Sequence, residues 1–184
     1  MPNSIATGCT KVDSAQIEDL DVANCITELA SALTAFQSQK NRTQYEIVGI
    51  QTGGSWIANA LAKALTHPND LGSLNISFYR DDFTVKGLHP HVSPSNLPFE
   101  VNDAHIVLVD DVIMSGRTIR AALNEIFDFG RPKSVTLVTL IDLVANDLPI
   151  RPDICALRLT LEDQQRVKLT GPSPMKLAVR TINE

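Results

Sequence analysis

Residues 106–118 read IVLVDDVIMSGRT, and this stretch decides the fold class. Its four apolar residues, Ile106 to Val109, are typical of a short buried strand, and the pair Asp110-Asp111 follows them. A small polar turn at Ser115-Gly116 then precedes apolar residues at helical spacing, which end before Gly130. The stretch therefore predicts a strand, a turn and a helix, which is the repeating unit of a parallel α/β sheet.

The flanking sequence repeats this unit. A strand at Tyr45–Ile50 is followed by the turn Thr52-Gly53-Gly54 and by an apolar helix face over 56–65. Further strands are predicted at 74–78, 135–141, 154–159 and 166–169, and an amphipathic helix over 22–36 with a capping box at Asp13 and Gln16. We therefore expect an α/β fold, a mainly parallel twisted sheet flanked by helices, in a single domain spanning 1–184.

Composition and charge exclude several classes of protein. The chain has 184 residues, 43% of them hydrophobic, so it can bury a core, and its net charge of −5 disfavours general binding to nucleic acid. Residues 1–13 contain no apolar segment and the apolar runs elsewhere are too short to cross a bilayer, so we expect a cytoplasmic protein without a membrane partner. The cysteines, Cys9, Cys25 and Cys155, are odd in number and far apart, which predicts neither a disulfide framework nor a zinc site.

The loops at the carboxyl ends of the strands are the expected ligand site, because parallel sheets bind ligands there. Three loops, 51–55, 110–118 and 142–147, should converge. Residues 114–118 open a helix, whose free N–H groups favour a phosphate, and Gly116 allows close approach of the backbone. Asp110 and Asp111, on what we expect to be an exposed loop, are placed to accept hydrogen bonds from vicinal hydroxyls.

Similar residues also occur in ordinary turns and in the P-loop of NTPases. Taken separately, an Asp-Asp pair and a Ser-Gly turn are usually solvated turns, and only their combination favours a site. A P-loop NTPase would need a glycine where Asp111 stands and a lysine where Arg117 stands, so that class is excluded.

Residues 107–118 resemble the motif by which type I phosphoribosyltransferases bind phosphoribosyl diphosphate (PRPP). Residues 79–82, 130–132 and 148–151 further resemble the PyrR family of pyrimidine operon regulators, which has uracil phosphoribosyltransferase activity. The resemblance covers 47–169 and implies the type I phosphoribosyltransferase fold, with a flexible lid or arm at about 80–101 and a C-terminal hood at about 143–184. It also implies PRPP and Mg²⁺ as ligands, a homodimer or dimer of dimers, and in some members UMP-dependent binding of leader RNA.

The resemblance assigns roles to individual residues. Asp110 and Asp111 would hold the ribose hydroxyls, and Mg²⁺ indirectly through ribose or water, while the turn at 52–54 would bind diphosphate with a non-proline cis peptide bond. Arg80, at the start of the arm, would stabilise the departing diphosphate, so Asp110, Asp111 and Arg80 are the catalytic candidates. The PRPP-binding set is Thr52, Gly53, Gly54, Arg80, Asp81, Asp110, Asp111, Met114, Ser115, Gly116, Arg117 and Thr118, and the base-binding set is Val112, Leu143 and Cys155.

The sequence departs from the family pattern at two places. Gly53 stands where many members have arginine in the diphosphate loop, so Arg80 and Mg²⁺ would carry more of the charge. Residues 142–147 read DLVAND where the family often has DRGHRE, so three basic residues are missing and Leu143 replaces the arginine expected near the base. We therefore expect weak or absent RNA binding at physiological salt.

Three functions are compatible with the sequence. The first is transfer of the phosphoribosyl group from PRPP to uracil, giving UMP and diphosphate, with pyrimidine-operon regulation as an added activity. The second is a UMP-sensing, RNA-binding transcription attenuator in which catalysis is secondary. The third is a purine or xanthine phosphoribosyltransferase, because the residues that bind the base are the hardest to identify in the sequence. His89, His91 and His105 are expected on the surface or the arm rather than as catalytic bases.

Overall fold

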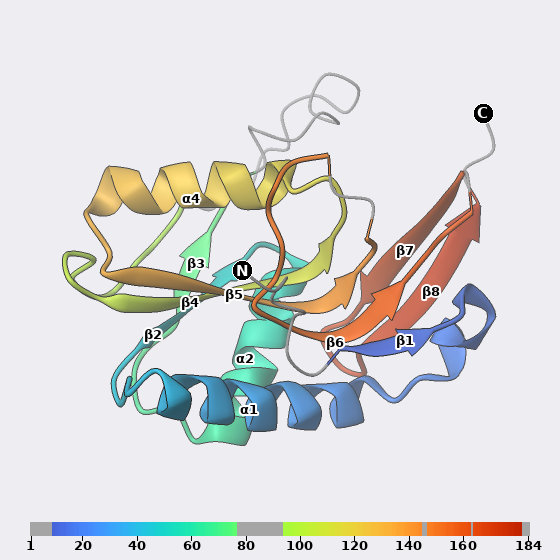
Figure 1. Ribbon diagram of the computed structural model, residues 1–184, viewed down its shortest axis with the longest axis horizontal. Coiled ribbons are helices and arrows are strands. Elements are labelled where there is room, and N and C mark those ends of the chain that lie inside the picture. Colours follow the sequence, from blue (N-terminus) through green and yellow to red (C-terminus); the bar gives the residue numbers. More distant parts are fainter. Residues whose placement is uncertain (1–8, 77–93, 145–146, 163, 182–184) are drawn as a thin grey trace.

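The computed structural model describes residues 9–76, 94–144, 147–162 and 164–181, which form a layered α/β arrangement (Figure 1). Within them, six strands make one sheet in the order β1-β6-β5-β4-β2-β3, and every neighbouring pair is parallel. The strands are β1 (Thr10–Val12), β2 (Glu46–Ile50), β3 (Gly72–Leu74), β4 (His105–Ile113), β5 (Ser134–Asp142) and β6 (Ile154–Leu159). The predicted fold class is confirmed.

Helices cover both faces of the sheet. Figure 1 shows α1 (Val22–Gln39) and α2 (Gly53–Leu65) on one face and α4 (Arg117–Phe129) on the other. Leu29 and Val107 belong to the core under α1 and α2, whereas Leu108 and Ile126 belong to the core under α4. Neighbouring residues of a strand point to opposite faces of the sheet. A strand with a core on both faces therefore needs a continuous apolar run, as the sequence has. No helix among the described residues has the length and apolar composition needed to cross a lipid bilayer.

The direction of the strand order changes between β2 and β4, and parallel α/β sheets form their ligand crevice at the carboxyl ends of such a pair of strands. From β2 the chain passes through α2 to β3, on one side of β2, whereas β4 lies on the other side and continues through α4 to β5. The connections after β2 and β4 therefore diverge to opposite faces of the sheet, which is the arrangement that leaves room for a ligand between them.

The cap of the first helix and the strand predicted at 74–78 differ from the sequence predictions. The Asp13 N–H donates to Gln16 Oε1 at 3.4 Å, but this box begins a 3₁₀ helix, η1 (Ser14–Asp19), and α1 is capped instead by Asp21, whose Oδ1 accepts the Ala23 N–H. The strand predicted at 74–78 overlaps β3, which lies at 72–74 because its pairing with β2 starts at Gly72 and ends where Leu74 meets Ile50, the last residue of β2. Residues 77 and 78 of the prediction lie outside the described residues.

The C-terminal strands β7 (Gln165–Thr170) and β8 (Lys176–Thr181) form an antiparallel hairpin outside the main sheet. The predicted strand at 166–169 is confirmed, whereas β1 and β8 were not predicted. Within the stretch 143–184, β6 belongs to the main sheet and the hairpin stands apart from it (Figure 1).

The prediction of no disulfide is wrong, because the structure joins Cys9 to Cys155. Their Cα atoms lie 5.0 Å apart, inside the usual range for a disulfide. The pairing of β1 with β6 brings Cys9 to the start of β6, across 146 residues of chain. Sequence spacing shows no such proximity, since it arises only when the first and last strands of the sheet become neighbours.

Candidate functional site

The end of the turn after β2 and the first residues of α2 lie directly against the acidic pair of β4. Of the turn predicted at 52–54, Thr52 is in the turn, whereas Gly53 and Gly54 begin α2. A Cβ atom at Gly53 would overlap the Asp111 carboxylate, and one at Gly54 would lie 3.0 Å from the Asp110 Cα. The peptide bond between Gln51 and Thr52 is cis, as the resemblance implied. Glycine at both positions is therefore what allows residues 53–54 and the acidic pair to touch.

The acidic pair lies within β4 and not on an exposed loop. Asp110 is 2% exposed, Asp111 is half-buried, and the Asp111 N–H donates to Asp110 Oδ1 at 3.0 Å. The expectation of an exposed loop is wrong because β5 is as long as β4 and continues to pair with it up to Ile113. The backbone of both aspartates is thus part of a rigid sheet, which suits residues that position a ligand.

The five residues from Met114 to Thr118 bend around the start of α4. Gly116 has a left-handed backbone with φ of 87°, a conformation that glycine adopts without a steric penalty. The Ser115 Oγ accepts the Arg117 N–H at 3.3 Å, and α4 begins at Arg117. Helix N-termini with free N–H groups attract anions, so this bend fits the phosphate group that the sequence predicted.

The loop after β5 is tied to the same bend. The Leu143 N–H donates to the Ile113 carbonyl at 3.0 Å, and the Leu148 N–H donates to the Ser115 carbonyl at 3.1 Å. Arg117 and Asp147 also form an ion pair of 3.8 Å between exposed side chains. The three loops predicted to converge therefore do so.

Of the three residues assigned to the base, two lie at this end of the sheet. Val112 is half-buried at the end of β4, and Leu143 follows β5 with its side chain 5% exposed and packed in the core. Cys155 pairs with Thr139 in the middle of β5, is fully buried and is bonded to Cys9. The structure does not bring Cys155 to the other site residues, so its assignment to the base is withdrawn.

Some predicted residues lie elsewhere. Arg80, Asp81, His89 and His91 fall outside the described residues. His105 begins β4, at the opposite end of the sheet from the site, where its Nδ1 lies 2.7 Å from the Ser134 Oγ. Burial and the nearby cations Arg42 and Lys133 lower the pKa of His105, and its position excludes contact with a ligand at the strand ends.

Sequence reasoning missed one ion pair beside this site. Asp142, the last residue of β5, binds Arg158 of β6 at 3.0 Å. The only sequence signal was the position of Asp142 at a strand end, since Arg158 is brought to it by strand pairing.

The carboxylates fit a magnesium ion that arrives with a phosphorylated substrate. Among the described residues, no group of three histidine, cysteine, aspartate or glutamate side chains could hold a metal ion. Mg²⁺ usually binds one or two carboxylates together with substrate oxygens and water, and Asp110 and Asp111 can supply that number.

Comparison with known proteins identifies the family. The phosphoribosyl transferase domain model matches residues 16–170. The bifunctional protein PyrR of Pseudomonas savastanoi pv. phaseolicola is 53% identical over 163 residues, covering 89% of this chain and 96% of the relative. The bifunctional protein PyrR of Pseudomonas paraeruginosa is 55% identical over 161 residues, covering 88% of this chain and 95% of the relative.

Solved structures agree on the fold. The Trypanosoma cruzi hypoxanthine phosphoribosyl transferase is similar with a TM-score of 0.59 at 18% identity, covering 76% of this chain and 74% of that one. The HGPRT-ase of Leishmania tarentolae, solved with GMP, is similar with a TM-score of 0.59 at 16% identity, covering 76% of this chain and 77% of that one. Since the family model matches residues 16–170 and the PyrR relatives match over nearly the whole chain, the chain belongs to the phosphoribosyltransferase family and, within it, to the PyrR proteins.

Proposed function

We propose that this protein transfers the phosphoribosyl group from PRPP to uracil, forming UMP and releasing diphosphate. The observation that carries the proposal is the contact of the turn at Gly53-Gly54 with Asp110 and Asp111, beside the bend at 114–118. The contact supports the proposal because the segments assigned to the diphosphate, the ribose and the 5′-phosphate adjoin one another in the order in which these groups occur along PRPP.

Each part of the crevice has a role in this proposal. Residues 114–118 bind the 5′-phosphate, Asp110 and Asp111 accept hydrogen bonds from the ribose hydroxyls, and the backbone at Thr52 to Gly54 binds the diphosphate. Arg80 and Asp81 join from the arm at 80–101, whose role rests on the sequence resemblance alone. Uracil lies near Val112 and Leu143, which stand at the ends of β4 and β5.

The chemistry needs position and charge more than covalent catalysis. As the bond between the anomeric carbon and diphosphate breaks, positive charge grows on the ribose ring and negative charge grows on the diphosphate. Fixed dipoles and charges that match this separation lower the barrier, and the carboxylates on a rigid strand hold the ribose in place. When bound, Mg²⁺ supplies positive charge that offsets the charge of the leaving diphosphate.

The same proposal covers the setting of the protein. It acts in the cytoplasm, as a homodimer or dimer of dimers, and folds as one domain with the arm and a C-terminal hood. The Cys9–Cys155 pair is expected to be reduced in that compartment, because cytosolic thiol systems keep most disulfides open.

A second activity, regulation of a pyrimidine operon, is favoured by the relatives, which are named bifunctional PyrR proteins. The net charge of −5 and the uncharged side chains of Leu143 and Val144 weaken the case for an RNA partner. We therefore propose phosphoribosyl transfer as the main activity and RNA-dependent regulation as a second, separate one.

The proposal is tested by measuring diphosphate release from PRPP and Mg²⁺ with each of five acceptors, namely uracil, orotate, hypoxanthine, guanine and xanthine. Uracil should give the highest kcat/KM. A higher kcat/KM with a purine base than with uracil would show that the acceptor is a purine. No diphosphate release with any of the five bases would overturn phosphoribosyl transfer as the activity.

A further inference from the structure

The loop after β5 contains a valine in an unusual backbone conformation. Val144 has a φ of 58°, in the left-handed region that a β-branched residue rarely adopts. Neighbouring contacts must hold it there, and such residues gather at sites where the local geometry matters for function. Val144 follows Leu143, at the end of the crevice assigned to uracil.

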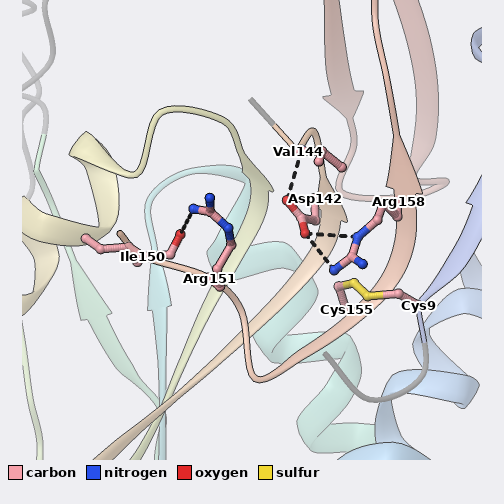
Figure 2. A network of polar contacts seen from close by, with 7 residues as sticks. All are labelled: Cys9, Asp142, Val144, Ile150, Arg151, Cys155 and Arg158. Carbon is pink, nitrogen blue, oxygen red and sulfur yellow. Dashed lines mark hydrogen bonds and ion pairs between the residues drawn. A yellow bond between two sulfur atoms is a disulfide. The ribbon is translucent and has the colours of Figure 1, made fainter. Parts of the chain in front are cut away.

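The contact that holds Val144 is the Asp142 carboxylate (Figure 2). Asp142 Oδ1 accepts the Val144 N–H at 3.1 Å, while Oδ2 accepts Arg158 Nε at 3.2 Å and Nη2 at 3.0 Å. The Asp142 side chain is 2% exposed, so Arg158 supplies the opposite charge that a buried carboxylate requires. The carboxylate thus links the arginine to the backbone of the turn.

Arg158 is presented by a strand that is fixed on both sides. In the sheet Arg158 pairs with Asp142 of β5 and with Lys11 of β1. The guanidinium therefore starts from a rigid position, which is what allows it to orient a neighbour.

The turn also connects to the phosphate-binding bend. Leu143 donates its N–H to the carbonyl of Ile113, two residues after the acidic pair, and Leu148 donates its N–H to the carbonyl of Ser115 within the bend. A shift of the backbone at Leu143 and Val144 would therefore alter the space for the acceptor base next to the bound PRPP.

We propose that the Asp142–Arg158 ion pair is a positioning element for uracil: it holds Val144 in the left-handed conformation and so sets the backbone of residues 143–144 at the base site. Arg158 acts through Asp142 and does not touch the substrate. The inference rests on the proposed function, since uracil is the acceptor there.

The first test is Arg158→Gln, compared with Arg166→Gln, which removes the same charge from an exposed position on β7. Arg158→Gln should raise KM for uracil roughly tenfold and leave KM for PRPP within about twofold, because the Asp142 carboxylate holds residues 143–144 at the base site, whereas the ribose and phosphate are assigned to residues 110–118. Arg158→Lys keeps the charge, and its KM for uracil should lie between those of the wild type and of Arg158→Gln. Arg166→Gln should match the wild type.

The second test uses Val144→Gly in the Arg158→Gln background. Glycine adopts a φ of 58° without steric penalty, so the turn no longer depends on the ion pair and KM for uracil should return most of the way to the wild-type value. A purely structural role of Arg158 would not be rescued at Val144. An unchanged KM for uracil in Arg158→Gln, an equal rise for both substrates, or no rescue by Val144→Gly would each overturn the proposal.

Two further measurements keep the outcomes separate. If the wild type does not use uracil, the proposed function fails. Amide exchange at Val144 then tests the positioning of the turn by itself. The exchange should be faster in Arg158→Gln than in the wild type, and equal exchange rates would refute the positioning role. If Arg158→Gln does not fold, the pair Asp142→Asn with Arg158→Gln removes the unpaired buried charge and is assayed in its place.

Discussion

At the residue scale, the candidate site depends on how closely Gly53 and Gly54 allow the start of α2 to approach the acidic pair. Gly53 faces the end of the flexible Asp111 side chain, whereas Gly54 faces the backbone of Val109 and Asp110. A side-chain carboxylate can rotate away from an added methyl group, but a strand inside a sheet cannot. Neighbouring glycines in one turn therefore differ in what a substitution would disturb.

We predict that Gly53→Ala weakens PRPP binding and that Gly54→Ala weakens the fold. In Gly53→Ala the Asp111 carboxylate must move, so PRPP affinity should fall by about ten- to a hundredfold while the unfolding midpoint changes little. In Gly54→Ala the strand itself is displaced, with a loss of stability of about 1–3 kcal/mol. Isothermal titration with PRPP and Mg²⁺ and denaturant unfolding separate the two effects, and identical behaviour of the two variants would contradict the packing described for this turn.

Asp111 is the carboxylate of the pair that can be changed without disturbing buried groups, because it is half-buried while Asp110 is buried. We expect Asp111→Asn to fold normally and to bind PRPP more weakly by about 1.5–3 kcal/mol, the value of a hydrogen bond to a charged acceptor. Binding is measured directly, with Asp128→Asn on the exposed face of α4 as the control of equal charge. PRPP affinity equal to that of the wild type in Asp111→Asn would remove Asp111 from the site.

At the element scale, the short strand β1 is the structural link between the N-terminal segment and the main sheet. It pairs with β6 over only three residues, and the disulfide joins Cys9, the residue before β1, to Cys155 of β6. Cys25 remains as a free buried thiol whose pKa is raised by burial and by the nearby carboxylates of Glu28 and Asp21, so it stays protonated and unreactive at neutral pH.

Reduction of this disulfide should lower stability. A crosslink restricts the unfolded chain, and removing a natural one usually costs about 2–5 kcal/mol. The denaturant midpoint of the oxidised wild type should therefore fall when a thiol reductant is added. Cys9→Ser should have the midpoint of the reduced wild type with and without the reductant. A midpoint of the oxidised wild type that does not respond to reductant would contradict the crosslink.

At the scale of the whole molecule, surface charge decides which partners can bind. The net charge is −5, and the cations near the N-terminal helix are partly engaged: Arg42 donates to the Thr136 Oγ1 at 3.1 Å and Lys40 lies 5.6 Å from the Phe36 ring centre. The loop after β5 contributes apolar Leu143 and Val144. A polyanion would thus meet few free cations on this part of the chain.

RNA binding should accordingly be weak or absent at physiological salt while uracil phosphoribosyl transfer persists. Each phosphate contact that is lost lowers the slope of log affinity against log salt by about 0.7–0.9, so replacing Ala145 and Asn146 by Lys and Arg should raise that slope by up to twice this amount. Gel shifts with a pyrimidine leader transcript across a salt series, with and without UMP, provide the measurement. Tight, UMP-stimulated binding by the wild type would show that a basic surface forms elsewhere, for example around Lys40 and Arg42.

The sequence by itself determined the α/β class, the main helices and the convergence of the loops around residues 52–54 and 110–118, because apolar periodicity and the motif at 107–118 are local properties of the chain. The tertiary structure alone decided that Asp110 and Asp111 lie inside β4, since the length of β4 depends on its pairing with β5. It also decided the Cys9–Cys155 bond and the partnership of Asp142 with Arg158, which join elements that are neighbours only in the folded sheet. Local patterns specify which elements form, whereas strand order specifies which of their side chains meet.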